Sequence, residues 1–239
     1  MTSLVDIRML FENQGGVFLS SPSVIAQKIA NIKAFVFDWD GVFNDGRKGG
    51  INASDFSEID SMGVNMLRFS SWLTQNKTLP ICAILTGADN KIANEFGVRE
   101  KFQKVYFKVL DKNKALDHLL ADHGFKAHEV AFFFDDILDM GVAQRCGLNV
   151  FISSPGKVML TEFVKNGRAD YITRMSGGEH GVREACELLI ALGNNYEEVI
   201  ERRFKFDQSY QSYLKERQGG STGFYTLSSQ GLITEHHVE

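Results

Sequence analysis

The stretch "FVFDWDGVFNDG" at residues 35–46 joins a run of apolar side chains directly to aspartates. Its first three residues are aromatic or β-branched, which is typical of a buried strand. Its aspartates, Asp38, Asp40 and Asp45, would be stable only in water or beside a cation. A buried strand that ends in this much negative charge indicates a cation-binding or catalytic position at its end.

Short apolar runs of the same kind recur along the chain, and helical periodicity separates them. The runs lie at 34–38, 81–86, 104–109, 130–135, 148–152 and 169–173, and the helical patterns at 58–75, 111–123 and 156–166. Continuous apolar runs suit parallel strands that are covered on both faces. The alternation predicts an α/β fold, a doubly wound, Rossmann-like, mostly parallel sheet with helices on both faces.

The pattern divides the chain into three parts. The chain after residue 180 reads as helical, with a last helix from Tyr196 toward Tyr213. The segment "RQGGSTGF" at 217–224 then predicts a flexible break, and the last fifteen residues a tail. The three parts are an N-terminal helical leader at 1–32, a catalytic domain at 33–194, and a C-terminal helical arm with a flexible tail at 195–239.

Composition narrows the class of protein. The 239 residues carry a net charge of -4 without a basic stripe, so a nucleic-acid partner is not expected. The sequence shows neither a signal peptide nor a long apolar stretch, so a membrane partner is not expected either. The three cysteines are far apart and lack metal-site spacing, which is typical of reduced thiols in a cytoplasmic protein.

Polar residues follow the predicted strands where ligands bind in an open α/β sheet, at the carboxyl ends. Carboxylates from two neighbouring strand ends would repel each other unless a cation lay between them. Mg²⁺ prefers oxygen ligands and shares its coordination with water and phosphate. The set therefore predicts a magnesium-dependent phosphoryl-transfer site. Besides Asp38 and Asp40, its members are Thr86, Gly87, Lys114, Asp135, Asp136 and Asp139.

Each piece has an ordinary structural interpretation when it is taken alone. "DWDG" could be an acidic turn, Asp135 and Asp136 could cap a helix, and Lys114 could be a solvated lysine. A calcium loop is excluded, because Val42 and Phe43 stand where an EF-hand needs a ligand and a glycine. The order of the residues also differs from that of a phospho-accepting receiver domain. The evidence for a site lies in their joint order, each at a strand exit.

This order resembles the haloacid dehalogenase (HAD) superfamily over residues 33–194. The strand with Asp-x-Asp-Gly is matched by "FVFDWDGV", the strand-end threonine by Thr86, the lysine that opens a helix by Lys114, and the late acids by "DDILD". "DGVFNDG" and "SGGEHGVREACELL" are similar to segments of the capless phosphatases that act on 3-deoxy-octulosonate 8-phosphate and related sugar acids. The stretch 41–80 is too short for a large cap domain.

The resemblance implies a two-step phosphomonoesterase reaction. Asp38 would attack phosphorus and form an aspartyl-phosphate. Asp40 would protonate the leaving group and then activate water. Thr86 and Lys114 would hold the phosphoryl group. The magnesium ligands would be Asp38, the backbone carbonyl of Asp40, and Asp135, with Asp136 and Asp139 as auxiliary residues and Asp45, Asp60 and Gly87 on the substrate side.

Three positions depart from the family pattern. Ile59 and Ala88 stand where the capless relatives have arginines, and Phe134 stands where they have a glycine. Without those arginines we expect a sugar or polyol phosphate less anionic than the octulosonate ester to be preferred. A non-catalytic HAD-like binding or assembly module remains the alternative, although the complete set of catalytic residue types favours an enzyme.

The resemblance also implies an assembly of identical chains. Residues 46–57 lie where the capless relatives carry a β-hairpin insertion, and Gly49-Gly50 could make its turn. In those relatives four hairpins meet in a tetramer, so we expect a homo-oligomer, with a tetramer favoured. The aromatic residues of the arm, among them Phe204, Phe206, Tyr210 and Tyr213, could take part in such contacts or could pack on their own domain.

Overall fold

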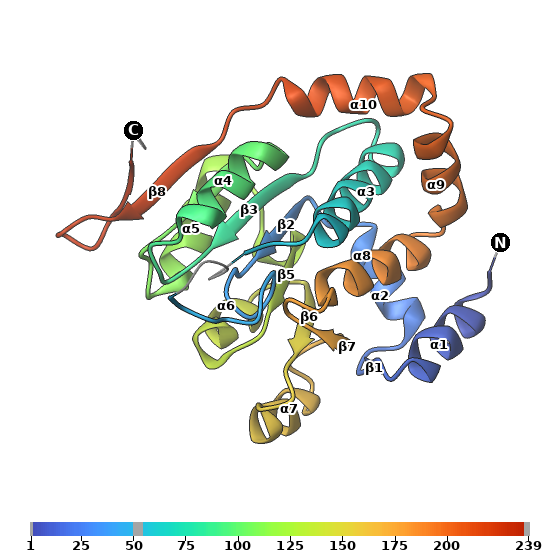
Figure 1. Ribbon diagram of the computed structural model, residues 1–239, viewed down its shortest axis with the longest axis horizontal. Helices are drawn as coiled ribbons and strands as arrows, with labels where there is room; N and C mark the ends of the chain where they lie inside the picture. The colour runs from blue at the N-terminus through green and yellow to red at the C-terminus, as the bar shows by residue number, and fades with distance from the viewer. Residues whose placement is uncertain (1, 50–54, 237–239) are drawn as a thin grey trace.

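The computed structural model describes residues 2–49 and 55–236, and these residues build one nine-stranded mixed sheet flanked by helices (Figure 1). The strand order is β1-β7-β6-β5-β2-β3-β4-β8-β9. All neighbours pair in parallel except β1 with β7 and β8 with β9. The strands are β1 (Val17–Phe18), β2 (Ala34–Phe37), β3 (Ile81–Leu85), β4 (Lys104–Tyr106), β5 (Val130–Phe134), β6 (Leu148–Ser153), β7 (Tyr171–Ser176), β8 (Gly223–Leu227) and β9 (Ile233–Glu235).

Helices cover both faces of the sheet. The α-helices are α1 (Leu4–Asn13), α2 (Pro22–Ile29), α3 (Glu58–Thr74), α4 (Lys91–Glu100), α5 (Lys112–His123), α6 (Met140–Ala143), α7 (Val158–Lys165), α8 (Gly181–Leu192), α9 (Tyr196–Phe204) and α10 (Gln208–Gln218). Two short 3₁₀ helices are η1 (Ala127–Glu129) and η2 (Ile137–Asp139). The expected α/β fold with a mostly parallel sheet is confirmed.

Strand β2 shows why the apolar runs are continuous. Phe35 and Phe37 lie in a core shared with α3, α4 and α8. Ala34 and Val36 lie in a second core, on the other face, shared with α5, α6 and α7. Because successive side chains of a strand point to opposite faces, a strand between two cores must be apolar at every position. All six runs form strands, and they bring their polar ends to one edge of the sheet.

The C-terminal arm differs from the sequence expectation in two ways. The single predicted helix is broken into α9 and α10, where Phe206 adopts a positive φ of 49° and Asp207 caps α10 by accepting from the Tyr210 backbone N–H at 2.9 Å. The predicted flexible break and tail are wrong, since β8 pairs with β4 and β9 with β8. Tyr225 of β8 stacks on Tyr106 of β4, with ring centroids 5.3 Å apart. The arm therefore extends the main sheet.

The aromatic residues of the arm divide between the two expectations. Tyr210 and Tyr213 are buried against α3, where each ring contacts Phe69. Phe204 and Phe206 are exposed. The two tyrosines therefore pack on their own domain, and the two phenylalanines remain available to a partner.

Two other expectations concern the leader and the insertion. The leader forms α1, β1 and α2, and β1 adds an antiparallel edge strand beside β7. Residues 50–54 of the expected hairpin lie outside the described residues, and its flanks at 46–49 and 55–57 contain no strand. Among the helices that the structure describes, none combines the length and the apolar character needed to cross a bilayer.

Candidate active site

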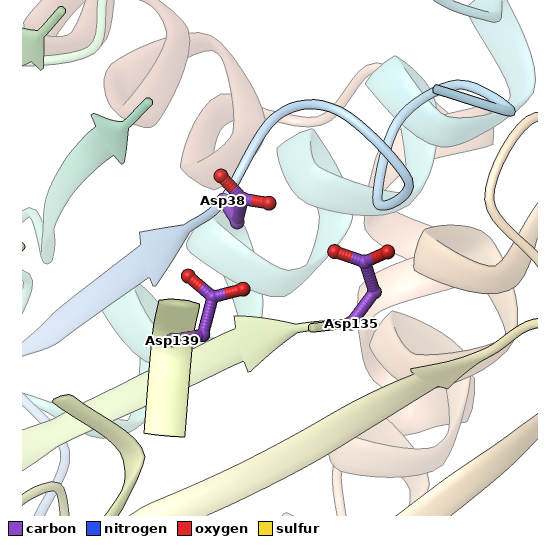
Figure 2. Close-up of side chains that lie close together, drawn as sticks. All are labelled: Asp38, Asp135 and Asp139. Carbon is purple, nitrogen blue, oxygen red and sulfur yellow. The ribbon is translucent and has the colours of Figure 1, made fainter. Parts of the chain in front are cut away.

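Asp38 and Asp135 meet because their strands are neighbours. In the parallel pair β2–β5, Phe37 lies opposite Phe133, and the Asp38 N–H donates to the Phe133 carbonyl at 2.9 Å. Asp139 follows one short helical turn after Asp135 and is fully buried. Figure 2 shows the three carboxylates converging at the carboxyl edge of the sheet, and one oxygen of each lies within 4.8 Å of the others.

Lys112 bridges two of these carboxylates. It is the first residue of α5, directly after the N-cap Asp111. Its Nζ donates to Oδ1 of Asp38 at 2.5 Å and to Oδ1 of Asp139 at 2.5 Å, and the residue is only 4% exposed. Burial by itself would lower the pKa of Lys112, but Asp38 and then Asp139 outweigh it and raise that pKa. Lys112 is therefore a permanent cation in the site.

The expectation for Lys114 was wrong. Lys114 Nζ donates to the Gly231 carbonyl at 3.0 Å and lies at the surface. Two residues along a helix correspond to about 200° of rotation, so Lys112 and Lys114 must point to opposite sides of α5. Asp111 is a favoured N-cap residue, and recognising it as the cap would have placed Lys112 at the first helical position.

Two acids of the site have pKa values well above that of an ordinary aspartate. Burial, reinforced by the charge of Asp38, raises the pKa of Asp135 to about 8 and that of Asp139 to about 6. Lys157 contacts Oδ2 of Asp135, donates to its carbonyl at 3.0 Å, and lies 3.0 Å from Oδ2 of Asp136. Three buried carboxylates thus face two lysines, and the cluster retains a deficit of positive charge.

These residues fit a magnesium ion. Oδ1 of Asp135 is buried and has no hydrogen-bond partner, although its sister oxygen is held by Lys157. An orphaned carboxylate oxygen beside two further carboxylates is costly unless a cation contacts it. The cluster includes Asp139, which the sequence had suggested only as an auxiliary residue. The carboxylate of Asp40 lies outside it.

Asp40 and Thr86 are linked by a residue that sequence reasoning missed. Asn90 Nδ2 donates to Oδ2 of Asp40 at 2.6 Å and to Oγ1 of Thr86 at 3.0 Å. Lys48 contacts Oδ2 of Asp40 and donates to Oδ1 of Asn90 at 3.0 Å. Asn90 follows Thr86 by four residues at the start of a helix, and this position after a strand end was the available signal.

The remaining predicted residues lie at different depths. Asp45 is exposed and pairs with Arg47 at 3.0 Å, and Gly87 follows Thr86 at the rim. Asp136 caps η2 by accepting from the Ile137 N–H at 2.6 Å. Asp136 also binds Lys157 and so supports Asp135 from outside the cluster.

Asp60 does not line the mouth of the site, contrary to expectation. It is fully buried in the first turn of α3, and its Oδ1 accepts from the backbone N–H of Arg183 at 2.8 Å. Arg183 is in the first turn of α8, so Asp60 caps a neighbouring helix. Burial raises the pKa of Asp60, while the hydrogen bond from Arg183 opposes that rise. Its role in the described structure is to join α3 to α8.

Gly41 and Phe134 keep the strand ends of the site free of bulky side chains. Gly41 has a φ of +89°, and a Cβ there would lie 2.0 Å from Oδ2 of Asp135, so only glycine fits between the two strand ends. Phe134 is fully buried between Phe132 and Phe151. It points into the core and leaves the site open.

At the carboxyl edge of a mostly parallel α/β sheet lie an Asp-x-Asp strand end, a strand-end threonine, a buried lysine and a late acidic pair. This arrangement defines a HAD-type hydrolase. The chain is 30% identical over 174 residues to the 3-deoxy-D-manno-octulosonate 8-phosphate phosphatase KdsC of Yersinia pestis, covering 70% of this chain and 83% of that protein. No family model matches the chain.

Solved structures agree with this similarity. The phosphatase of the same name from Yersinia pestis aligns with a TM-score of 0.59 and 28% identity, over 73% of this chain and 89% of that one. The enzyme from Moraxella catarrhalis, solved with magnesium, phosphate and 3-deoxy-octulosonate, aligns with a TM-score of 0.60 and 26% identity, over 74% of this chain and 96% of that one. The chain belongs to the 3-deoxy-D-manno-octulosonate 8-phosphate phosphatase family of the HAD superfamily.

Proposed function

We propose that the protein is a Mg²⁺-dependent phosphomonoesterase that forms an aspartyl-phosphate on Asp38. The observation that carries this proposal is the convergence of Asp38, Asp135 and Asp139 within 4.8 Å, with Lys112 bridging two of them. A buried group of acids at a strand end that has too few cations of its own suits a phosphoryl group bound together with a metal ion.

Each side chain has a role that follows from its position. Lys112 holds Oδ1 of Asp38, so the other carboxylate oxygen is the one that attacks phosphorus. Lys112 cannot act as a base, because its two carboxylates raise its pKa, and it neutralises charge on the transferring group. Asp40 gives a proton to the leaving oxygen and then takes one from water. Thr86 donates to a phosphoryl oxygen.

Magnesium would be held by Asp38, Asp135, Asp139 and the backbone carbonyl of Asp40. When bound, it offsets the negative charge of the acids and of the phosphoryl oxygens. Lys157 keeps Oδ2 of Asp135 occupied, so that Oδ1 faces the cluster.

One argument for a non-catalytic module, the phenylalanine at position 134, does not hold. Phe134 could have filled the site in place of a glycine, but it is buried in the core. The catalytic side chains converge without it.

The test is hydrolysis of p-nitrophenyl phosphate by the purified protein with Mg²⁺ and with excess EDTA. Turnover should require the metal and should fall by several orders of magnitude in Asp38→Asn, which removes the nucleophile. The variant should keep the wild-type melting temperature within a few degrees, because the amide has nearly the same shape. Equal turnover by Asp38→Asn, or full turnover in EDTA, would refute the proposal.

The substrate is a small phosphorylated metabolite, a sugar or sugar-acid phosphate. The names of the relatives support a sugar-acid ester. Ile59 is nearly half exposed at the start of α3, and Ala88 lies at the rim after Thr86, so neither position offers a cation. We therefore expect a less anionic sugar phosphate to exceed the octulosonate ester in kcat/KM. A tenfold preference for the octulosonate ester would contradict this expectation.

The protein is proposed to be a cytoplasmic homo-oligomer, most simply a tetramer. Its three cysteines are buried and free, which suits a reducing compartment. Exposed Phe204 and Phe206 offer apolar surface to a partner. Light scattering at micromolar concentration should give about four times the chain mass, whereas a clean mass of 26.8 kDa would exclude assembly.

A further inference from the structure

We propose that Asn90 is a positioning residue that fixes both the acid/base Asp40 and the hydroxyl proton of Thr86. The inference rests on the proposed phosphatase function and adds to it a residue outside the acidic cluster. Asn90 is only 6% exposed and stands at the N-cap of α4, four residues after Thr86.

The side chain of Asn90 does not make the hydrogen bond that is usual for an N-cap residue. Asparagine at an N-cap commonly accepts a hydrogen bond from the first turn of its own helix. Asn90 makes no such bond, and its side chain turns to the catalytic edge. Its Oδ1 accepts from Lys48 at 3.0 Å, so both amide hydrogens are available for acceptors.

One of these hydrogens fixes Asp40. Nδ2 of Asn90 lies 2.6 Å from Oδ2 of Asp40, and Lys48 contacts the same oxygen. Oδ2 of Asp40 is therefore held by two donors. Asn90 thus fixes the orientation of the carboxyl group that serves as acid and base.

The other hydrogen fixes Thr86. Oγ1 of Thr86 accepts from Asn90 Nδ2 at 3.0 Å and from the Ala88 backbone N–H at 3.3 Å. A hydroxyl has two acceptor positions and one donor hydrogen. With both acceptor positions used, Thr86 must donate its hydrogen, which suits a phosphoryl oxygen in front of the strand end. One buried amide therefore orients the proton donors for both the leaving group and the phosphate.

The test compares two leaving groups in Asn90→Ala. A sugar phosphate leaves as a poor alkoxide and needs the proton from Asp40, whereas p-nitrophenolate leaves without one. Misplacing a catalytic group can cost about 100-fold, so kcat/KM should fall about 100-fold for the best sugar phosphate and at most about tenfold for p-nitrophenyl phosphate. The smaller loss reflects Thr86, which serves both esters.

The control is Asn94→Ala, the same residue type one turn further along α4, whose Oδ1 has no hydrogen-bond partner. It should keep both activities within about twofold. If Asn90→Ala melts early, Asn90→Ser retains a favoured N-cap residue while it removes the amide. Equal losses for the two esters, or no loss, would overturn the inference and leave the proposed function standing. An inactive wild-type protein would instead refute the proposed function.

Discussion

The two ends of helix α4 lie in two groups of buried polar residues that differ in their charge balance. The N-terminal end, at Asn90, borders the catalytic acids, which outnumber their lysines and include an orphaned oxygen on Asp135. The C-terminal end carries Glu100, which accepts from the Ser61 hydroxyl at 2.8 Å and from Arg217 at 3.1 Å. Around Glu100 the acid is matched by arginine.

The comparison shows what charge balance does in a folded protein. Around Glu100, Arg217 also donates to Asn65 at 3.0 Å, and Arg68 donates to the Glu100 carbonyl at 2.5 Å. These bonds tie the C-terminal arm to α3 and α4. The catalytic acids are left short of cations, so their burial costs stability and is offset only when a ligand binds. An acid that lies among buried arginines serves the fold, and acids short of cations serve function.

The largest effect is expected from removing Lys112, the buried cation that bridges two of the catalytic acids. Lys112→Met keeps the length of the side chain but leaves Asp38 and Asp139 without a bridge. Removing a preorganised charge partner of a reacting group typically costs about 10²- to 10³-fold, and we expect that loss in kcat at saturating Mg²⁺. Lys114→Met is the matched control and should stay within about twofold. A similar loss in both variants would mean that the two lysines act together.

The next effect concerns stability and the opposite end of α4. Arg217→Met removes the buried cation of Glu100 and leaves it only the more exposed Arg99 at 3.4 Å, which should lower the free energy of unfolding by about 3 kcal/mol in urea titration. The double variant Glu100→Gln/Arg217→Met should recover much of this loss, because the amide at position 100 carries no charge that needs a buried cation. Lys215→Met, exposed on the same helix, should change stability by less than about 0.5 kcal/mol. An equally unstable double variant would show that packing, and not charge, holds the arm.

The smallest effect is a pH dependence of metal binding. Burial and the charge of Asp38 raise the pKa of Asp135 to about 8, so this carboxyl holds a proton at neutral pH when no metal is present. Magnesium must displace that proton. Apparent Mg²⁺ affinity should therefore rise up to about tenfold per pH unit from pH 6 to pH 8 and level off above.

The stability of the metal-free protein should change with pH in the opposite direction to the Mg²⁺ affinity. A carboxyl with a raised pKa stays protonated in the folded state while the unfolded chain ionises, so the metal-free protein should lose stability as the pH rises from about 4 to about 8, and Mg²⁺ should restore it. Calorimetric titration of Mg²⁺ into the protein in two buffers would count the protons released on binding.

Asp135→Asn should abolish the pH dependence of the Mg²⁺ affinity. A flat affinity profile for the wild-type protein would contradict the prediction.

Much of the fold could be predicted because the central strands are covered on both faces. Continuous runs of apolar residues are typical of such strands, and the polar residues after them mark the catalytic edge. Strand β8 was missed because Gly219, Gly220 and Ser221 precede it and suggest a break. Its pairing depends on Tyr106, more than a hundred residues earlier, and local sequence does not contain such a partner.

The site was predictable in type and less so in detail. Asp38, Asp40, Thr86 and Asp135 follow directly from strand ends. The helix that carries the lysine was predicted at 111–123 and observed at Lys112–His123, so the error lay in assigning Lys114, which points away from the site because two residues along a helix reverse the face. Asp60 was misplaced because an acid near a predicted site was given a functional role, whereas a buried carboxylate can equally serve the N–H groups of another helix.

The ion pair between Glu100 and Arg217 joins residues 117 positions apart in the chain. On the ribosome, the acid is made first and its cation follows well over a hundred residues of growing chain later. Until Arg217 has left the exit tunnel, Glu100 has only the more exposed Arg99 beside it and lacks the buried cation that it pairs with in the folded protein. The α/β sheet is therefore expected to reach its final packing late in synthesis, with the whole domain folding as one unit rather than strand by strand.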